Sequence, residues 1–313
     1  MQRSATRRGI LALVAGIAIF SVQDVILKLL SGDYPLHQAM LLRSLTALPF
    51  HVAIVWWFDR TLATIVTPGR WKMLARGLLN FTAYTCYYLG LAYLPLADTI
   101  ALFFTNPLFI TLAAAALFGE RVGIVPAVAV AMGFAGVLMI VKPGAEGFEL
   151  AALLPIIGAL GYALSMVIAR PMAKVETAAA MSFWGNVCFL LCAVVLSLIF
   201  GFGHFSGATH PSVAFLTRGW VMPSGFDLML MASCGVISAV GISLLTYAYS
   251  AAPSSTVAPF EYSFMFWGLL WGWLFWGSLP DTLAWVGIAV IIGAGLLVIR
   301  APQVKKAAPE GAA

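Results

Sequence analysis

Four ionisable residues stand inside long apolar stretches of the sequence. Asp24 and Lys28 are four residues apart and would share one face of a helix. Arg43 lies in the next apolar stretch, and Glu261 lies in a late one. Burying such groups in a membrane costs about 3 kcal/mol each, so they usually mark substrate, ion or proton sites. All four are therefore candidates for substrate binding or coupling.

The placement of Asp24 and Arg43 predicts a buried ion pair. Both residues stand about two turns from the ends of their helices that are joined by the intervening loop. Antiparallel neighbouring helices then bring them to similar depth. The pair would be either a charged wall of a substrate cavity, able to hold a carboxylate or exchange a proton, or a self-neutralising brace. Lys28 adds a second base and leaves net positive charge.

Glu261 has no charged neighbour in its own stretch. Its helix face continues through Met265, Gly268 and Gly272, and the two glycines form a stripe that admits a neighbouring helix. We therefore expect Glu261 to point into the protein. A buried carboxyl there would suit proton coupling, whereas the alternatives are a hydrogen bond to another helix or access to cytoplasmic water.

Polar and aromatic groups complete the candidate site. Asn106-Pro107 interrupts an apolar stretch, so Asn106 would either contact substrate or satisfy the broken helix. Tyr84, Tyr88 and Tyr262 would stack on a planar substrate, such as an aromatic amino acid or a flavin-like ring, or simply pack in the core.

The sequence carries no pattern typical of catalysis, metal binding or nucleotide binding. The four cysteines have no His, Asp or Glu nearby to complete a metal site, and phosphate-loop motifs are absent. No clustered Lys or Arg surface predicts a nucleic-acid partner. We expect no cofactor, no metal and no enzyme activity.

Composition indicates what must position these residues. Of the 313 residues, 62% are hydrophobic and 9% are charged, against about 25% charged in soluble domains. A soluble enzyme, a disordered chain and a disulfide-rich secreted module are excluded. The stretches are about 20 residues long without strand-like alternation, which predicts an all-α polytopic membrane protein. The expected spans are 9–30, 36–57, 75–95, 98–118, 123–142, 150–169, 177–200, 228–249, 257–277 and 282–300.

Basic residues predict the orientation of these ten transmembrane helices. With the N-terminus inside, the outer loops hold only Lys142 and Arg218. The inner loops and tails hold Arg3, Arg7, Arg8, Arg60, Arg70, Lys72, Arg76, Arg121, Arg170, Lys174, Arg300, Lys305 and Lys306. Both termini are therefore expected to be cytoplasmic.

The sequence indicates an internal duplication, with one half at 1–146 and the second at 147–302. A cytoplasmic tail, 303–313, follows. Tyr93-Leu94-Pro95 in the first half matches Tyr249 to Pro253 in the second, and an aromatic helix follows each. Five helices per half is an odd number, so the second half must be inverted. Inverted five-helix repeats are typical of secondary transporters, with substrate bound between the halves.

With these motifs the sequence resembles the EamA-type drug/metabolite transporter superfamily over nearly its full length. The resemblance rests on Ala92 to Pro95, its counterpart Ala248 to Pro253, and Leu117 to Arg121 ahead of Gly133 to Ile140. It implies export or import of amino acids, vitamins or nucleotide-like solutes. The second-half hinge is Gly277-Ser278, where the family usually has Gly-Glu, so symmetric use of Glu120 is not expected.

The sequence therefore predicts a secondary active transporter of a small organic metabolite in the bacterial inner membrane. Protons or an exchanged solute would drive alternating access. A membrane-embedded lipid-modifying enzyme is one alternative, but it would need clustered acids and histidines on the cytoplasmic loops, which are short and basic. A passive channel or scaffold is the other, and it would need neither an inverted repeat nor buried charges.

Overall fold

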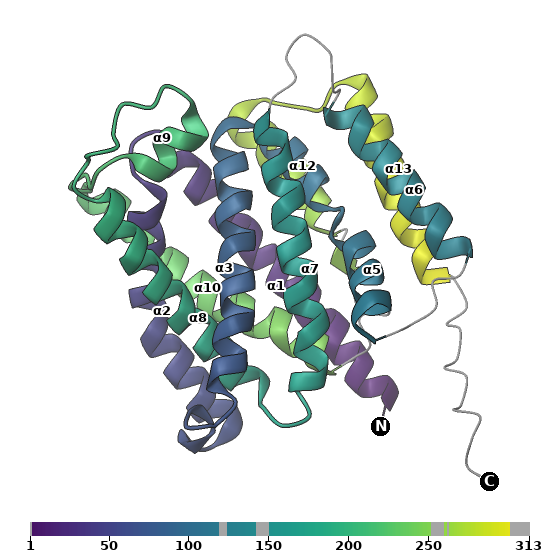
Figure 1. The fold of residues 1–313 in the computed structure, drawn as a ribbon, viewed down its shortest axis with the longest axis horizontal. Helices are drawn as coiled ribbons and strands as arrows, with labels where there is room; N and C mark the ends of the chain where they lie inside the picture. Colours follow the sequence, from purple (N-terminus) through teal and green to yellow (C-terminus); the bar gives the residue numbers. More distant parts are fainter. Residues whose placement is uncertain (1, 119–123, 142–149, 252–259, 262, 301–313) are drawn as a thin grey trace.

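The computed structural model describes residues 2–118, 124–141, 150–251, 260–261 and 263–300. Within these ranges the chain is helical, without strands (Figure 1). The helices are α1 (Gln2–Leu30), α2 (Leu36–Asp59), α3 (Arg70–Tyr93), α4 (Leu96–Phe103), α5 (Asn106–Phe118), α6 (Ile124–Val141), α7 (Leu153–Met172), α8 (Ala178–Phe200), α9 (Pro211–Thr217), α10 (Gly225–Ala251), α12 (Ser263–Trp276) and α13 (Thr282–Arg300). The all-α prediction is confirmed.

Five helical segments of the described chain are long and apolar enough to cross a membrane by themselves. They are Arg7–Leu30, Leu36–Asp59, Leu150–Ala169, Ala178–Phe200 and Gly225–Ala251. The predicted span 75–95 is occupied by the 24-residue helix α3. Shorter apolar helices lie in the predicted spans 98–118, 123–142 and 282–300, and α12 occupies the described part of 257–277. The number of ten spans and the sides of the termini stay predictions.

The fourth predicted span is broken where the sequence indicated. α4 ends at Phe103 and α5 begins at Asn106. The backbone N–H groups of Phe104 and Thr105 bond to carbonyls three or four residues back, and Pro107 has no N–H to continue the ladder. The break places the Asn106 side chain inside the protein, where it is 2% exposed.

Helices from both ends of the chain pack against one another. α1 packs on α10, α3 on α7, α2 on α8 and on α10, and α4 on α12. One core cluster of apolar and aromatic side chains joins α1, α3, α4, α7, α8, α10 and α12. This shared core surrounds the cavity described below.

α6 and α13 form a close pair beside the other helices, at the right of Figure 1. A Cβ placed on Gly136 would lie 2.7 Å from the carbonyl oxygen of Gly287, and a Cβ on Gly287 would lie 2.7 Å from that of Gly136. Only glycine permits such a mutual approach of two backbones. The contact ties a helix of the first predicted half to one of the second.

Hydrogen bonds join loops at both ends of α2. Near its start, the Tyr34 hydroxyl donates to Asp227 at 2.7 Å, and this bond raises the pKa of Tyr34. At its other end, Thr177 donates to Asp59 at 2.6 Å and Thr67 donates to Glu176 at 2.7 Å. Loops distant in the sequence are therefore fastened together at both ends of the helix.

Candidate functional site

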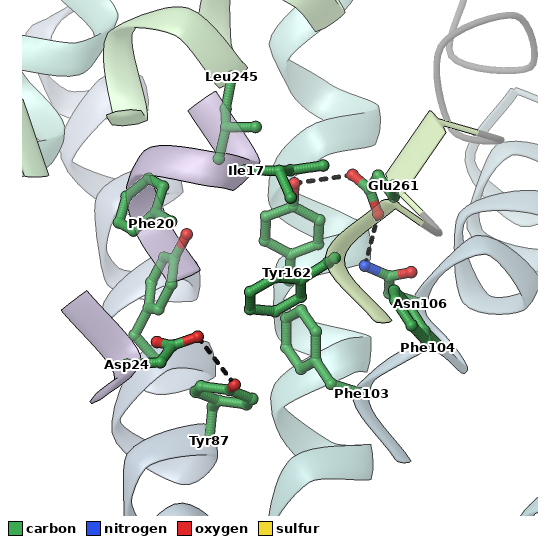
Figure 2. A pocket seen from close by; sticks show the side chains of 12 residues that line it. Ile17, Phe20, Asp24, Tyr87, Phe103, Phe104, Asn106, Tyr162, Leu245 and Glu261 are labelled. Atoms are coloured by element: carbon green, nitrogen blue, oxygen red, sulfur yellow. Dashed lines mark hydrogen bonds between the residues drawn. The ribbon is translucent and has the colours of Figure 1, made fainter. Parts of the chain in front are cut away.

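A cavity of about 50 Å³ lies in the shared core (Figure 2). It is lined by Ile17, Phe20, Asp24, Tyr84, Tyr87, Phe103, Phe104, Asn106, Tyr162, Leu245, Glu261 and Phe264. These residues come from α1, α3, α4, α5, α7, α10 and α12 and from the segments beside them. A cavity of this size holds a few water molecules, because each needs roughly 10–15 Å³ by this measure.

Glu261 anchors one side of the cavity through three hydrogen bonds. The Asn106 Nδ2 atom donates to Glu261 Oε2 at 2.7 Å, and the Tyr162 hydroxyl donates to Oε1 at 2.9 Å (Figure 2). The Tyr249 hydroxyl donates to the same Oε1. Of the alternatives that the sequence left open for Glu261, hydrogen bonding to other helices is observed, with one donor each from α5, α7 and α10.

This cluster can serve both protonation states of a carboxyl group. The Asn106 amide nitrogen can only donate, whereas the tyrosine hydroxyls can donate to a carboxylate or accept from a protonated acid. Glu261, with Met265, Gly268 and Gly272 on the same face, is buried as the sequence indicated. Gain and loss of a proton here needs only rotation of hydroxyl groups.

Asp24 lies across the cavity from Glu261. Its Oδ2 atom accepts a hydrogen bond from the Tyr87 hydroxyl at 3.1 Å (Figure 2). The side chain is 3% exposed. The cavity thus has one acid from α1 and one from the segment before α12.

The predicted ion pair between Asp24 and Arg43 is wrong for these described residues. The Arg43 guanidinium instead lies over the Phe189 ring of α8, 5.0 Å from its centroid. Its Nε and Nη1 atoms are buried without a hydrogen-bond partner. Depth along the helices was a poor guide because the long arginine side chain turns toward α8 while Tyr87 bonds to the carboxyl.

Lys28 also lies away from the cavity. Its Nζ atom donates to the carbonyl oxygens of Leu91 at 2.8 Å and Leu94 at 2.7 Å, at the end of α3. It stands 5.6 Å from the centroid of the Trp276 ring. A cation suits the C-terminal end of a helix, where unpaired carbonyls gather. Lys28 therefore joins α1 to α3 and α12.

The three candidate tyrosines differ in their surroundings. Tyr84 lines the cavity and stacks between Phe20, at 5.9 Å between centroids, and Tyr88, at 6.0 Å. Tyr88 is fully buried behind it, and its hydroxyl accepts from Gln23 Nε2 at 2.6 Å. Tyr262 lies outside the described residues, as does Glu120.

Sequence reasoning missed Tyr162 and Tyr249 as partners of Glu261, because only the packed helices determine which hydroxyls reach this carboxyl. It also placed Arg76 among the inner loop residues, whereas Arg76 is 1% exposed within α3 and its Nε donates to the Ser165 carbonyl at 3.1 Å. Arg76 is the second residue of the predicted span 75–95, so its burial could have been predicted. Among the described residues no group of acids, histidines or cysteines has the arrangement of a metal site.

The chain is similar to a known family and to known proteins. The model of the EamA-like transporter family matches residues 7–142. A riboflavin transporter of Rhizobium johnstonii is 34% identical over 239 residues, covering 76% of this chain and 73% of that protein. The chain belongs to the EamA-like transporter family.

Other relatives extend the likeness along the chain. A pseudopaline exporter of Pseudomonas aeruginosa is 26% identical, covering 94% of this chain and 96% of that one. A solved crystal structure of another protein has the same fold, with a TM-score of 0.65, 18% identity, and coverage of 95% and 98%. This EamA-family member is therefore a multi-pass membrane protein that transports a small molecule, and it is not an enzyme.

Proposed function

We propose that this EamA-family protein is a secondary active transporter of a flat aromatic metabolite, with riboflavin as the first compound to test. The observation that carries the proposal is the cavity, in which aromatic rings surround two buried acids, Asp24 and Glu261. Aromatic walls stack on planar rings, and a few polar groups orient them. The riboflavin transporter of Rhizobium johnstonii supports this choice of compound.

Alternating access would operate between two inverted five-helix halves, residues 1–146 and 147–302. Helix packing supports this. If the halves are exchanged, α1 corresponds to α7, α2 to α8 and α3 to α10. The contact of α1 with α10 then becomes that of α7 with α3, and the contact of α2 with α10 becomes that of α8 with α3; all four are present. The pairs α2 with α8 and α6 with α13 each exchange into themselves, and the pair α5 and α7 turns into α12 and α1. A two-fold relation between the halves produces this pattern.

Glu261 is the proposed proton-coupling group. It joins Asn106 of the first half to Tyr162 and Tyr249 of the second, so its protonation changes the bonds that hold the halves together. Asp24 and Tyr84 would contact the substrate directly. Tyr88, Tyr262, Arg43 and Lys28 remain candidates, with Arg43 and Lys28 acting from outside the cavity lining.

A metabolite does not fit in the cavity at its present volume. The cavity is far smaller than the roughly 300–1,000 Å³ of typical ligand sites, and loop contacts are formed at both ends of α2. Binding of a metabolite would require the halves to move apart on one side. We place the protein in the bacterial inner membrane with both termini in the cytoplasm.

Flux measurements test the proposal. The purified protein is reconstituted in liposomes, and entry of radiolabelled riboflavin is followed with and without an imposed pH gradient. We expect saturable flux that the gradient accelerates. Flux that rises linearly with concentration would favour the passive-channel alternative, and absence of flux would reject riboflavin as the substrate.

A further inference from the structure

We infer that the cavity selects flat substrates that are neutral or positively charged and rejects anionic ones. This inference rests on the proposed transport function and adds the charge class of the substrate. It follows from which polar groups line the cavity and from where the nearby bases are held.

The lining is rich in acceptors. Asp24 and Glu261 both line it, whereas no Lys, Arg or His is among the described lining residues. Three donors beside these acids are already engaged: Tyr87 donates to Asp24, while Tyr162 and Asn106 donate to Glu261. Tyr84 adds a hydroxyl that can donate or accept. In their ionised form the acids have spare hydrogen-bonding capacity only for accepting, which suits substrate N–H groups or a cation.

Three bases on the surrounding helices do not offset this arrangement by contact. Lys28 is bonded to two carbonyl oxygens at the end of α3. Arg43 lies over Phe189, and Arg76 donates to Ser165. An anionic group in the cavity would meet two acids and find no base within its walls, which is a repulsive device against such substrates.

The aromatic walls strengthen the preference. Faces of Phe and Tyr rings attract cations through their quadrupoles and stack with neutral heteroaromatic rings. Phe20, Tyr84, Phe103 and Phe264 all line the cavity. Neutral and cationic flat compounds thus gain from the same surfaces, whereas an added negative charge gains from none of them.

A matched pair of compounds tests the inference. Riboflavin and riboflavin 5′-phosphate share one ring system and differ by an anionic group, and acriflavine supplies a flat cation. Uptake into proteoliposomes is measured for each, with thermal stabilisation of the purified protein as a binding readout. We expect uptake of riboflavin or acriflavine to exceed that of the phosphate at least about tenfold, the scale of one lost favourable charge contact.

Two variants locate the cause. Asp24→Asn keeps a partner for Tyr87 but cannot carry a negative charge, so it should raise uptake of the phosphate relative to riboflavin. Arg43→Gln removes a base outside the lining, so in contrast to Asp24→Asn it should not raise the relative uptake of the phosphate. Both are checked for monodispersity by size-exclusion chromatography before comparison.

The outcomes separate the two proposals. Wild-type uptake of the phosphate equal to that of riboflavin, lost in Arg43→Gln, would overturn the charge inference while transport stands, since Arg43 would then be an anion ligand. Absence of uptake and of stabilisation for all three compounds would overturn both the flat-substrate proposal and the charge inference.

Discussion

At the scale of single residues, Glu261 shows how a buried acid can be prepared for reversible protonation. It is 4% exposed, and its partners come from three separate helices. Two of these partners are hydroxyls that can reverse their role between donor and acceptor. The group can therefore lose its proton without losing its position.

Replacing Glu261 by Gln tests this role directly. The amide keeps the size and one acceptor oxygen, but it cannot release a proton, so we expect flux that no longer responds to a pH gradient. Counterflow of substrate without a gradient should persist at a reduced rate. Initial rates in proteoliposomes at two external pH values measure this, and an unchanged response to pH would argue against coupling at Glu261.

Removing one hydroxyl distinguishes support from coupling. Tyr162→Phe leaves Glu261 with its Asn106 and Tyr249 bonds, so transport should remain driven by the gradient, with the pH midpoint of transport displaced. The loss of one hydrogen bond to a charged group has an energy of about 1.5–3 kcal/mol, enough to move a midpoint by about one to two pH units. A pH profile identical to wild type would contradict this.

Residue types and spacing predicted which groups deserve attention but not which groups meet. The glycines after Glu261 correctly indicated that it points inward. The side-chain directions of Arg43 and Lys28 could not be predicted. Each long side chain can reach several carbonyl groups or aromatic rings, and only the packing of the helices determines which of them it contacts. The Asp24–Arg43 pair failed for that reason.

At the scale of helices, the ranges were largely predictable because apolar stretches end at charges, prolines and turns. The break at Asn106-Pro107 was also predicted from the sequence, and α4 and α5 separate at that position. Which helices pack against one another could be predicted less well from the sequence. Small residues mark close approaches, yet the sequence does not state which glycine meets which.

Glycines on α13 provide a matched test of this point. A Cβ on Gly287 would lie 2.7 Å from the Gly136 carbonyl oxygen, whereas one on Gly293 meets nothing within 4 Å. We expect Gly287→Ala to destabilise the protein by about 1–3 kcal/mol, the usual range for overpacking. Gly293→Ala should be neutral or slightly stabilising.

Thermal unfolding of the purified variants, followed by tryptophan fluorescence, measures the difference. Equal melting temperatures for Gly287→Ala and Gly293→Ala would show that α6 and α13 are not in tight contact. The same pair of variants, assayed for flux, reports whether this contact moves during transport.

The loop contacts at the ends of α2 make a prediction about access. Thr67→Val combined with Thr177→Val removes the hydrogen bonds to Glu176 and Asp59 at one end, leaving Tyr34 and Asp227 at the other. The cavity should then open more often at the weakened end. Tyr34→Phe should favour opening at the opposite end.

Cysteine labelling reads out this shift. Leu245→Cys places a thiol in the cavity lining, in a background with the four native cysteines replaced by serine. Modification by a membrane-impermeant maleimide, added to either side of oriented vesicles, should rise from opposite sides in the two variants. Equal labelling from both sides would contradict the prediction.

At the scale of the whole molecule, composition alone was sufficient for the class of protein, and the family comparison agrees with it. A chain with 9% charged residues cannot cover a soluble surface. The substrate could not be predicted in the same way, because it depends on a few side chains converging from helices distant in the sequence. Ten spans, their orientation and the inverted repeat remain predictions.

Ligand binding should be visible as stability of the entire protein. A substrate that binds the folded form at 100 times its dissociation constant adds about 2.7 kcal/mol. Riboflavin at increasing concentration should therefore raise the melting temperature of the wild-type protein progressively. The rise should be smaller for Tyr84→Ala, which removes a ring from the cavity wall; an equal rise would place the binding elsewhere.

The fastenings at the two ends of α2 also bear on speed. Each consists of a few side-chain hydrogen bonds, and a bond of this kind contributes a net 0.5–1.5 kcal/mol or so. Because these contacts are weak, the protein could open at either end without a large activation barrier. In the proposed cycle, contacts of this strength would allow many turnovers driven by small gradients, and a strong inhibitor would be a compound that stabilises one closed end by bridging its loops.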